Sequence, residues 1–499
     1  MVKYRIRSDF VDPAEPTDFE AFMVFSGTTF LFLFLPLLLL LYFCGKSIRW
    51  RNAVLLIFSL LFYAWGEPVW VFGMIVITLI NYALALMIRR TREPLLRKLL
   101  LALAVIVSLS LLFWFKYSTF LYNTFTALFG SASRMEAKHL PIGISFYTFQ
   151  VLTYTVDVYR KKAKPQTNPF RALLYISCFP QLIAGPIVQY SDVAAQLSER
   201  QTKPTDFLRG MQRFILGLAK KILLANICGK MLSETTLAGT GAPLSFLGAW
   251  TSAILFSMQL YFDFSAYSDM AIGLGRVFGF RYKENFDHPY LSGSITEFWR
   301  RWHISLGSFF RDYVYIPLGG NRRGTARTIL NLAIVWTLTG LWHGASWNFA
   351  LWGVFYFVLL VLERFVFRDA LDRFPRWIRH VFTLLLVVIG WVIFYYTDFA
   401  AMGSHLLAMI GISNVNGLRV TALWDANLLT VWKRYTVLPL LMAFLCLPVK
   451  DWLSARFQRT KRLAFWGELL GALALSAMFV LSLIFLIGES YNPFIYFRF

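Results

Sequence analysis

The feature that most constrains this chain is its repeated alternation between apolar stretches and short basic clusters. Several of the apolar stretches approach the ~20 residues that a membrane-spanning helix needs, and others are shorter. Because basic residues concentrate on the cytoplasmic side of membrane proteins, we expect the clusters to lie on that side. Six clusters hold 29 of the 49 lysines and arginines and only six acids; they are residues 45–52, 89–98, 160–171, 300–327, 363–379 and 450–462.

The composition excludes several classes of protein. Apolar residues make up 58% of the chain and charged residues 15%, although the formal net charge is +22. So little polar surface cannot cover a soluble globule, which argues against a soluble enzyme, a disordered nucleic-acid-binding tail and a secreted disulfide scaffold. The four cysteines are scattered without a CxxC pair. The chain is therefore predicted to be an all-α polytopic membrane protein.

The apolar stretches connect the basic clusters in pairs, which predicts hairpins that leave the cytoplasmic side and return. Pro180 and Pro186 make residues 170–190 re-entrant or broken, and the lysines and arginines within residues 207–229 suggest an interfacial helix. In total we expect roughly 11 to 14 membrane segments around a central funnel or tunnel. The other expected segments are residues 25–43, 53–65, 69–88, 99–115, 140–159, 328–347, 348–362, 381–396, 435–449 and 463–488.

The chain is expected to divide into three parts. Residues 1–22 are polar and read as a disordered leader, or as a start placed too early before Met23, and they contain no cleavable signal pattern. Residues 23–488 form the transmembrane domain. An even number of crossings between the basic clusters then puts the tail, residues 489–499, on the extracytoplasmic side.

Ionisable side chains at membrane depth are candidates for function, and His343 is one of them. A helix that starts at Thr328 reaches this histidine after about 22 Å, deep in the membrane and toward its outer side. The neighbouring Gly340 and Gly344 permit close approach of another backbone or of a substrate. A structural histidine bonded to a nearby carbonyl remains the alternative.

A second histidine, His303, lies within the most basic cluster, beside Arg300, Arg301, Trp302 and Arg311. A cationic platform with indole faces suits a phosphorylated donor with an aromatic head, such as a coenzyme A thioester. Anionic lipid headgroups are the alternative partner, and charge alone does not choose between them. The two histidines together also suit a proton path. No metalloprotease, P-loop or serine-hydrolase motif is present, and no metal site is predicted.

Seven motifs resemble those of the bacterial membrane-bound O-acyltransferases, in the branch that acetylates exported polysaccharides such as alginate. The resemblance extends from about Met23 to the C-terminus, and its most specific parts are the long element around His303 and the Gly-Leu-Trp-His-Gly element around His343. The motifs are residues 140–149, 184–186, 261–265, 294–306, 311–313, 318–322 and 340–344.

This resemblance implies a function. Such proteins take an acetyl group from cytosolic acetyl-CoA and pass it across the bacterial inner membrane for O-acetylation of an exported polysaccharide. The family's essential histidine corresponds to His343, and its second characteristic histidine to His303. The implied partners are an extracytoplasmic acetyltransferase of the SGNH-hydrolase type, the polysaccharide export machinery and membrane lipid, with no nucleic acid.

The C-terminal residues 494–499 resemble an F-x-Y-x-x-F motif of related systems, in which the tyrosine relays the acyl group. Here that tyrosine is Tyr496, and an aromatic belt at the membrane interface is the alternative. Because a hydroxyl is a weak nucleophile until a base removes its proton, we expect His343 to deprotonate Tyr496 or a partner's serine. A tyrosyl ester would be a good carrier, because a phenolate (pKa about 10) is a better leaving group than an alkoxide.

Other functions remain open. Within the family, D-alanyl transfer to teichoic acid or O-acetylation of peptidoglycan would use the same machinery. Outside it, the two histidines could serve a proton-coupled transporter, and the chain could be a scaffold for a polysaccharide export complex.

Overall fold

The computed structural model describes residues 23–130, 133–136, 138–236, 244–367, 373–413, 419–449, 452, 456–457, 461–488 and 494–495. The expected leader, residues 1–22, lies outside these ranges. Of the expected tail, the described part is Phe494 and Ile495, so Tyr496 also lies outside the described residues.

The described chain is almost entirely helical. Its first half contains η2 (Phe30–Phe34), α1 (Leu35–Cys44), α2 (Ile48–Gly66), α3 (Trp70–Arg90), α4 (Pro94–Leu112), η3 (Phe113–Tyr117), α5 (Ser118–Leu128), α6 (Ile144–Tyr159), α7 (Pro169–Ser177), α8 (Phe179–Leu182), α9 (Tyr190–Val193), α10 (Pro204–Ala219), η4 (Lys220–Ala225) and α11 (Asn226–Thr236).

The second half contains α12 (Phe246–Val277), η5 (Pro289–Leu291), α13 (Ile295–Arg301), α14 (Ile304–Phe310), η6 (Arg311–Tyr315), α15 (Thr325–His343), α16 (Trp347–Phe365), α18 (Arg376–Tyr395), α19 (Phe399–Ala408), α20 (Ala426–Tyr435), α21 (Leu438–Leu445) and α23 (Lys461–Gly488). The strands β1 (Ile412–Ser413) and β2 (Arg419–Val420) pair antiparallel, with Ile412 opposite Val420.

Five helical segments in the described ranges are long and apolar enough to cross a membrane: α3, the run from α4 through α5, α16, α18 and α23. The pair α20 and α21 is bent by 66° and adds a sixth if it forms one span. These segments and the high helical content confirm an all-α polytopic membrane protein. The other expected segments lie in helices that are shorter, broken or less apolar; α2 and α15, for example, are as long as α16 but do not meet the same criterion of apolar character. The number of membrane segments therefore stays a prediction.

Two local expectations are confirmed. The predicted hairpin of residues 53–88 is formed by α2 and α3, with Glu67 at the turn. The stretch of residues 170–190 is broken, because α7 and α8 are followed by non-helical residues before α9 begins.

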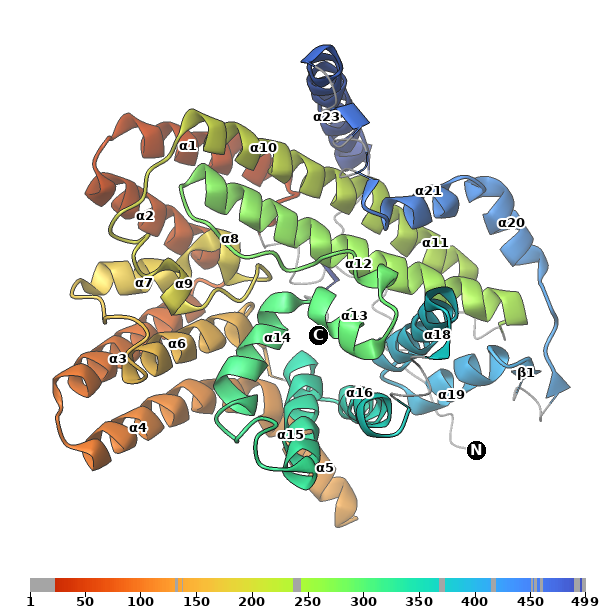
Figure 1. The fold of residues 1–499 in the computed structure, drawn as a ribbon, viewed down its shortest axis with the longest axis horizontal. Coiled ribbons are helices and arrows are strands. Elements are labelled where there is room, and N and C mark those ends of the chain that lie inside the picture. Colours follow the sequence, from red (N-terminus) through yellow and green to blue (C-terminus); the bar gives the residue numbers. More distant parts are fainter. Residues whose placement is uncertain are drawn as a thin grey trace.

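The long helix α12 was not among the expected membrane segments, yet it lies at the centre of the fold beside α10 (Figure 1). Glycines allow this close packing. A Cβ atom on Gly210 would lie 2.6 Å from the Gly273 carbonyl oxygen, and one on Gly217 would lie 2.7 Å from that of Ala266. Small residues at a helix crossing let two backbones approach closely in a membrane protein. Residues 207–229, expected as an interfacial helix, form α10, η4 and the beginning of α11.

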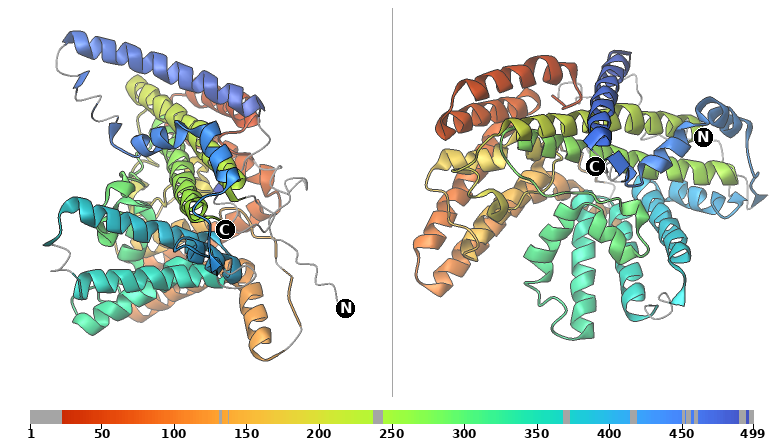
Figure 2. Two further views of the ribbon diagram at one scale, coloured as in Figure 1. Left: turned by 90° about the vertical axis from the view of Figure 1, so that its right-hand side faces the viewer. Right: turned by 45° about the horizontal axis from the view of Figure 1, so that its top comes forward.

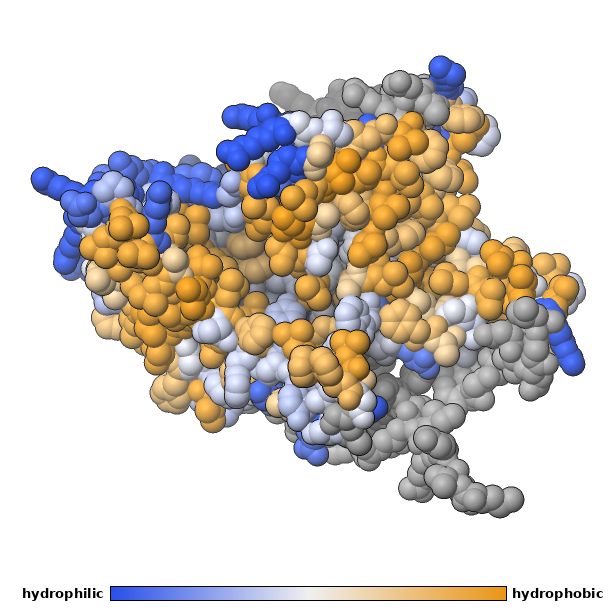
Figure 3. All heavy atoms as spheres, turned by 90° about the horizontal axis from the view of Figure 1, so that it is seen from below, coloured by the Kyte–Doolittle hydropathy of each residue, from blue (hydrophilic) through white to orange (hydrophobic). Residues whose placement is uncertain are grey.

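The helices surround a central region on several sides. In the right-hand view of Figure 2, α15, α16 and α18 fan out below α10 and α12. The helices α3 and α4 lie to the left of this fan. Figure 3 shows a broad apolar belt on one face, with strongly hydrophilic side chains gathered mainly along its upper edge. This distribution is typical of a surface in contact with lipid.

The buried apolar residues form two large clusters that meet at α12. The first cluster is built mainly from α1 to α10 and includes Phe264 of α12. The second is built mainly from α11, α13, α16 and α18, and it includes Tyr261 of the same helix. The first also contains Trp342 and the second Trp352. The residues around both candidate histidines therefore lie where the two clusters meet.

Candidate functional site

His303 lies at the junction between two short helices, α13 and α14. Its backbone has φ = 45°, a left-handed conformation that is uncommon for a residue with a side chain. The start of α13 is fixed by Glu363 of α16, whose carboxylate accepts hydrogen bonds from Ile295 N (2.6 Å) and Thr296 N (3.1 Å). The strained turn at His303 thus follows a helix that is held in place at its other end.

Asn285 fixes both the His303 ring and the start of α14. Its backbone oxygen accepts from Ile304 N (2.9 Å), and its side-chain Oδ1 accepts from Ser305 N (3.1 Å), so it satisfies two otherwise unpaired amides of the helix N-terminus. The same Oδ1 lies 3.2 Å from His303 Nδ1. Since an amide oxygen only accepts, Nδ1 carries the proton and Nε2 keeps a lone pair. His303 Nε2 is buried and has no hydrogen-bond partner among the described residues.

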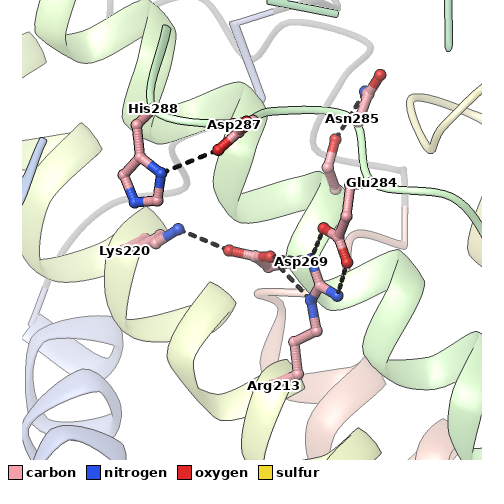
Figure 4. Close-up of polar contacts among 8 residues, drawn as sticks. Arg213, Lys220, Asp269, Glu284, Asn285, Asp287 and His288 are labelled. Atoms are coloured by element: carbon pink, nitrogen blue, oxygen red, sulfur yellow. Dashed lines mark hydrogen bonds and ion pairs between the residues drawn. The ribbon is translucent and has the colours of Figure 1, made fainter. Parts of the chain in front are cut away.

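An ion-pair network holds the segment that carries Asn285 (Figure 4). Arg213 of α10 binds Asp269 of α12 (Nε–Oδ1 2.9 Å) and also Glu284, the residue before Asn285 (Nη1–Oε1 2.6 Å). Lys220 binds the other oxygen of Asp269 at 2.6 Å. Two helices and the loop are therefore tied together next to the residue that orients His303.

A cavity of about 270 Å³ opens beside His303. Its walls are mostly aromatic and aliphatic, with two arginines, Arg311 and Arg364, among them. A ligand cavity of this kind combines apolar walls with a few polar groups that fix orientation. The lining residues are Trp299, Trp302, His303, Leu306, Gly307, Phe310, Arg311, Tyr315, Leu332, Val335, Trp336, Thr339 and Arg364.

The residues expected to hold the donor separate into two groups. Trp302 and Arg311 line the cavity, whereas Arg300 and Arg301 are not among its lining residues in the described part of the chain. Arg300 is exposed. Arg301 already pairs with Glu297 of its own helix, at 2.9 Å. The structure thus brings half of the predicted donor-binding set together with His303.

His343 is the last residue of α15, and its buried ring is enclosed by aromatic side chains. The ring centroids of Trp342, Trp352 and Phe394 lie 5.0, 5.1 and 5.2 Å from it, all in edge-on arrangements. A Cβ atom on Gly340 would collide with the carbonyl oxygen of Phe349 in α16. The glycine beside His343 therefore serves close approach of another backbone, one of the two roles expected from the sequence.

The C-terminal end of α15 is capped by a buried lysine from a distant segment. Lys116 Nζ in η3 donates to the carbonyl oxygens of Trp342 (2.5 Å) and His343 (3.3 Å), and it lies 3.3 Å from Ser145 Oγ. The next residue, Tyr117, donates its hydroxyl to Leu341 O (2.9 Å). A cation at this position complements the negative end of the helix dipole. Lys116 therefore holds the backbone that carries His343.

One indole links the two histidines. The Trp342 ring centroid lies 5.9 Å from that of His303 and 5.0 Å from that of His343. The two residues, 40 positions apart in the sequence, thus contact the same side chain. The sequence suggested the two histidines as two points on a path; the structure places one imidazole at the cavity and the other at the end of α15, both in contact with the Trp342 indole.

Three residues around these histidines could not be assigned to the site from the sequence. Lys116 had a signal, because it is the only charged residue between Leu99 and Leu128, but the expected segment ended at residue 115. Asn285 carries no comparable signal in the sequence. Asp263 binds Lys221 (2.7 Å) and Ile495 N (2.7 Å), partners that are far from it along the chain. No group of three metal-binding side chains occurs among the described residues.

Comparisons with known proteins identify relatives that cover most of the chain. The sequence model of the membrane-bound O-acyltransferase family matches residues 51–406. The chain is 41% identical to the probable alginate O-acetylase AlgI of Azotobacter vinelandii over 82% of its length and 83% of the relative. It is 37% identical to that of Pseudomonas putida over 96% and 100%. It is 33% identical to the peptidoglycan O-acetyltransferase of Helicobacter pylori over 79% and 81%.

Proposed function

Since the chain belongs to the membrane-bound O-acyltransferase family and is an acyltransferase, we propose that it transfers acetyl groups from cytosolic acetyl-CoA across the bacterial inner membrane for O-acetylation of an exported polysaccharide. The observation that carries this proposal is the pair of buried histidines on one indole, next to an aromatic cavity with two arginines. That arrangement combines a base with a site for an anionic donor.

The donor site is assigned to the cavity beside His303. Arg364 and Arg311 supply charge for the phosphates of coenzyme A, although Arg311 also pairs with the neighbouring Asp312 (Nε–Oδ1 2.8 Å). Guanidinium groups bind phosphate oxygens in a bidentate manner. The indoles of Trp299, Trp302 and Trp336 supply faces for an aromatic head group. The unprotonated His303 Nε2 would accept a hydrogen bond from the donor, which carries amide N–H groups.

The transfer step is assigned to His343. In the first step its imidazole removes the proton from the Tyr496 hydroxyl as the phenolic oxygen attacks the thioester carbonyl. The C–O bond of a tyrosyl ester forms, the C–S bond breaks, and the thiolate of coenzyme A takes the proton. In the second step a hydroxyl of the acceptor attacks the ester, and Tyr496 recovers its proton.

The acceptor side involves further proteins. An extracytoplasmic acetyltransferase of the SGNH-hydrolase type would collect the acetyl group and modify the polymer, in contact with the export machinery. The six basic clusters support a cytosolic donor side, and the same crossing pattern assigns the C-terminus to the outside. The alginate O-acetylase relatives favour an alginate-like polymer, whereas the Helicobacter pylori relative makes peptidoglycan the second candidate.

The proposal is tested with the purified protein and [14C]acetyl-CoA. We expect release of free coenzyme A, with label on the C-terminal peptide, and we expect the His343→Ala variant to lose both. A Tyr496→Phe variant that still acetylates polymer at the full rate would contradict the tyrosyl relay while leaving the role of His343 intact.

A liposome assay separates acyl transfer from transport. Protein that moves a solute or protons without consuming acetyl-CoA would contradict the proposal in favour of a transporter. The polymer is identified in cells by measuring ester-linked acetate on the exported polysaccharide and on peptidoglycan separately, with and without the His343→Ala substitution.

A further inference from the structure

A buried ion pair lies inside the fold between α12 and η4. Asp263 Oδ1 and Lys221 Nζ are 2.7 Å apart, and the two side chains are 2% and 6% exposed. Removing both charges from water is costly, and such a pair persists only when further hydrogen bonds satisfy the remaining atoms. The partner of the second carboxylate oxygen therefore matters.

That partner is the C-terminal segment of the chain. Asp263 Oδ2 accepts a hydrogen bond of 2.7 Å from the backbone N–H of Ile495, which lies 232 residues away in sequence. Phe494 and Ile495 are both buried, at 4% and 6% exposure. Phe494 belongs to the first apolar cluster and Ile495 to the second. The segment is thus anchored where the two clusters meet.

Aromatic residues of α12 complete the contact. The Phe494 ring centroid lies 5.0 Å from that of Tyr267 and 5.9 Å from that of Phe264. Asp263, Phe264 and Tyr267 are one, three and four positions apart, so one side of the helix supplies all three contacts. The hydrogen bond from the Ile495 backbone to the Asp263 carboxylate and the two ring contacts of Phe494 together form a specific site for this segment.

This site is close to His303. The Phe264 ring centroid lies 4.6 Å from that of His303, in an edge-on arrangement. The anchored segment is therefore separated from His303 by one aromatic ring. Tyr496 follows Ile495 directly, and consecutive Cα atoms are about 3.8 Å apart. An anchored Ile495 therefore tethers the residue that follows it in the sequence.

We propose that α12 carries a docking site for the chain's own C-terminal segment, in which Asp263 is a positioning residue and Lys221 pairs with its other carboxylate oxygen. This inference rests on the proposed function, in which Tyr496 carries the acetyl group. A docked tail does not have to reach the site by diffusion. Docking therefore raises the effective concentration of the Tyr496 hydroxyl at the site.

The test is hydrogen–deuterium exchange of the full-length protein, followed on the peptic peptide that ends at Phe499. Asp263→Asn keeps the shape of the side chain and an oxygen acceptor but removes the charge. Because hydrogen bonds to charged groups are stronger than neutral ones, we expect about tenfold faster exchange of the C-terminal amides. Lys221→Met should have a similar effect.

The matched control is Asp269→Asn, which removes a carboxylate six positions further along α12 and should leave exchange at the C-terminus unchanged. The double variant Asp263→Asn with Lys221→Met leaves neither charge buried alone, so it keeps the test available if a single variant does not fold. Unchanged C-terminal exchange in Asp263→Asn and in the double variant would overturn the docking site.

A second readout separates this inference from the relay. In a single turnover we expect Asp263→Asn to acetylate Tyr496 about tenfold more slowly, whereas Tyr496→Phe should keep the protected C-terminus of the unsubstituted protein. If Tyr496→Phe is fully active and still protected, the relay fails and docking stands. Fast tyrosine acetylation in Asp263→Asn despite lost protection would overturn the positioning role.

Discussion

The two histidines are held in opposite ways, although they contact the same indole. His303 is fixed through its side chain, because Asn285 binds Nδ1 and leaves Nε2 without a partner among the described residues. His343 is fixed through its backbone, because Lys116 binds its carbonyl oxygen and its ring lies among aromatic neighbours. Asn285 thus sets the tautomer and direction of one imidazole, and the end of α15 sets the position of the other.

This difference assigns different parts of the reaction to the region around His303 and to the region around His343. A ring with a fixed tautomer beside a cavity suits recognition of a donor that enters there. A ring at the end of α15, held by backbone contacts, suits a base that gains and loses a proton. Each of the following substitutions acts on one region and leaves the other in place, in order of decreasing expected effect.

The largest effect is expected from removing the base. His343→Ala should reduce the rate of coenzyme A release by about a thousandfold, since general base catalysis contributes roughly 10² to 10⁴. His303→Ala should reduce it less, about a hundredfold. Steady-state kinetics with acetyl-CoA measure both, and the reverse order would exchange the roles of the two regions.

The next effect comes from releasing the His303 ring. Asn285→Ala removes the acceptor at Nδ1 and the hydrogen bonds that Ser305 N (3.1 Å) and Ser305 Oγ (2.8 Å) donate to Oδ1, while the backbone bond from Ile304 N stays. We therefore expect about a thirtyfold loss of kcat/KM. The matched control is Ser268→Ala, which removes only the partner of the Asn285 amide nitrogen, 3.0 Å away. Equal losses in the two variants would argue that Asn285 acts on folding rather than on the ring.

A smaller effect is expected at the end of α15. Lys116→Met should lower kcat about tenfold and destabilise the protein by about 1–2 kcal/mol, because two helix carbonyls lose a charged donor. Tyr117→Phe removes a single bond to the same turn and should change kcat only a few-fold. Thermal unfolding in detergent and kcat values check both predictions. An unchanged kcat and unchanged unfolding temperature in Lys116→Met would show that Lys116 does not position His343.

The smallest effect concerns the donor cavity. Arg364→Gln should raise the KM for acetyl-CoA about fivefold with little change in kcat, which is the pattern of a lost ground-state contact. Arg300→Gln should have a smaller effect on KM, since Arg300 does not line the cavity. A larger effect at Arg300 would favour the donor platform expected from the sequence over the cavity found in the structure.

Several features could be predicted because they depend on local patterns. Apolar runs between basic clusters identified the membrane class and the hairpin of α2 and α3, and the break within residues 170–190 followed from the presence of Pro180 and Pro186. His303 and His343 stood out because ionisable residues are rare in such stretches. In contrast, α12 could not be predicted as a membrane segment, because Asp263, Asp269 and several serines interrupt its apolar pattern. In the folded protein, basic partners pair with both carboxylates.

The sequence by itself determined the class of the protein, its family and the two histidines, since these depend on composition, spacing and motif. Only the tertiary structure decided how the histidines are held. Lys116 meets His343 across 227 positions, and Asp263 meets Ile495 across 232. Such pairs depend on how helices pack and rotate against one another, and hydrophobic periodicity along one helix carries no information about which distant residue will face it.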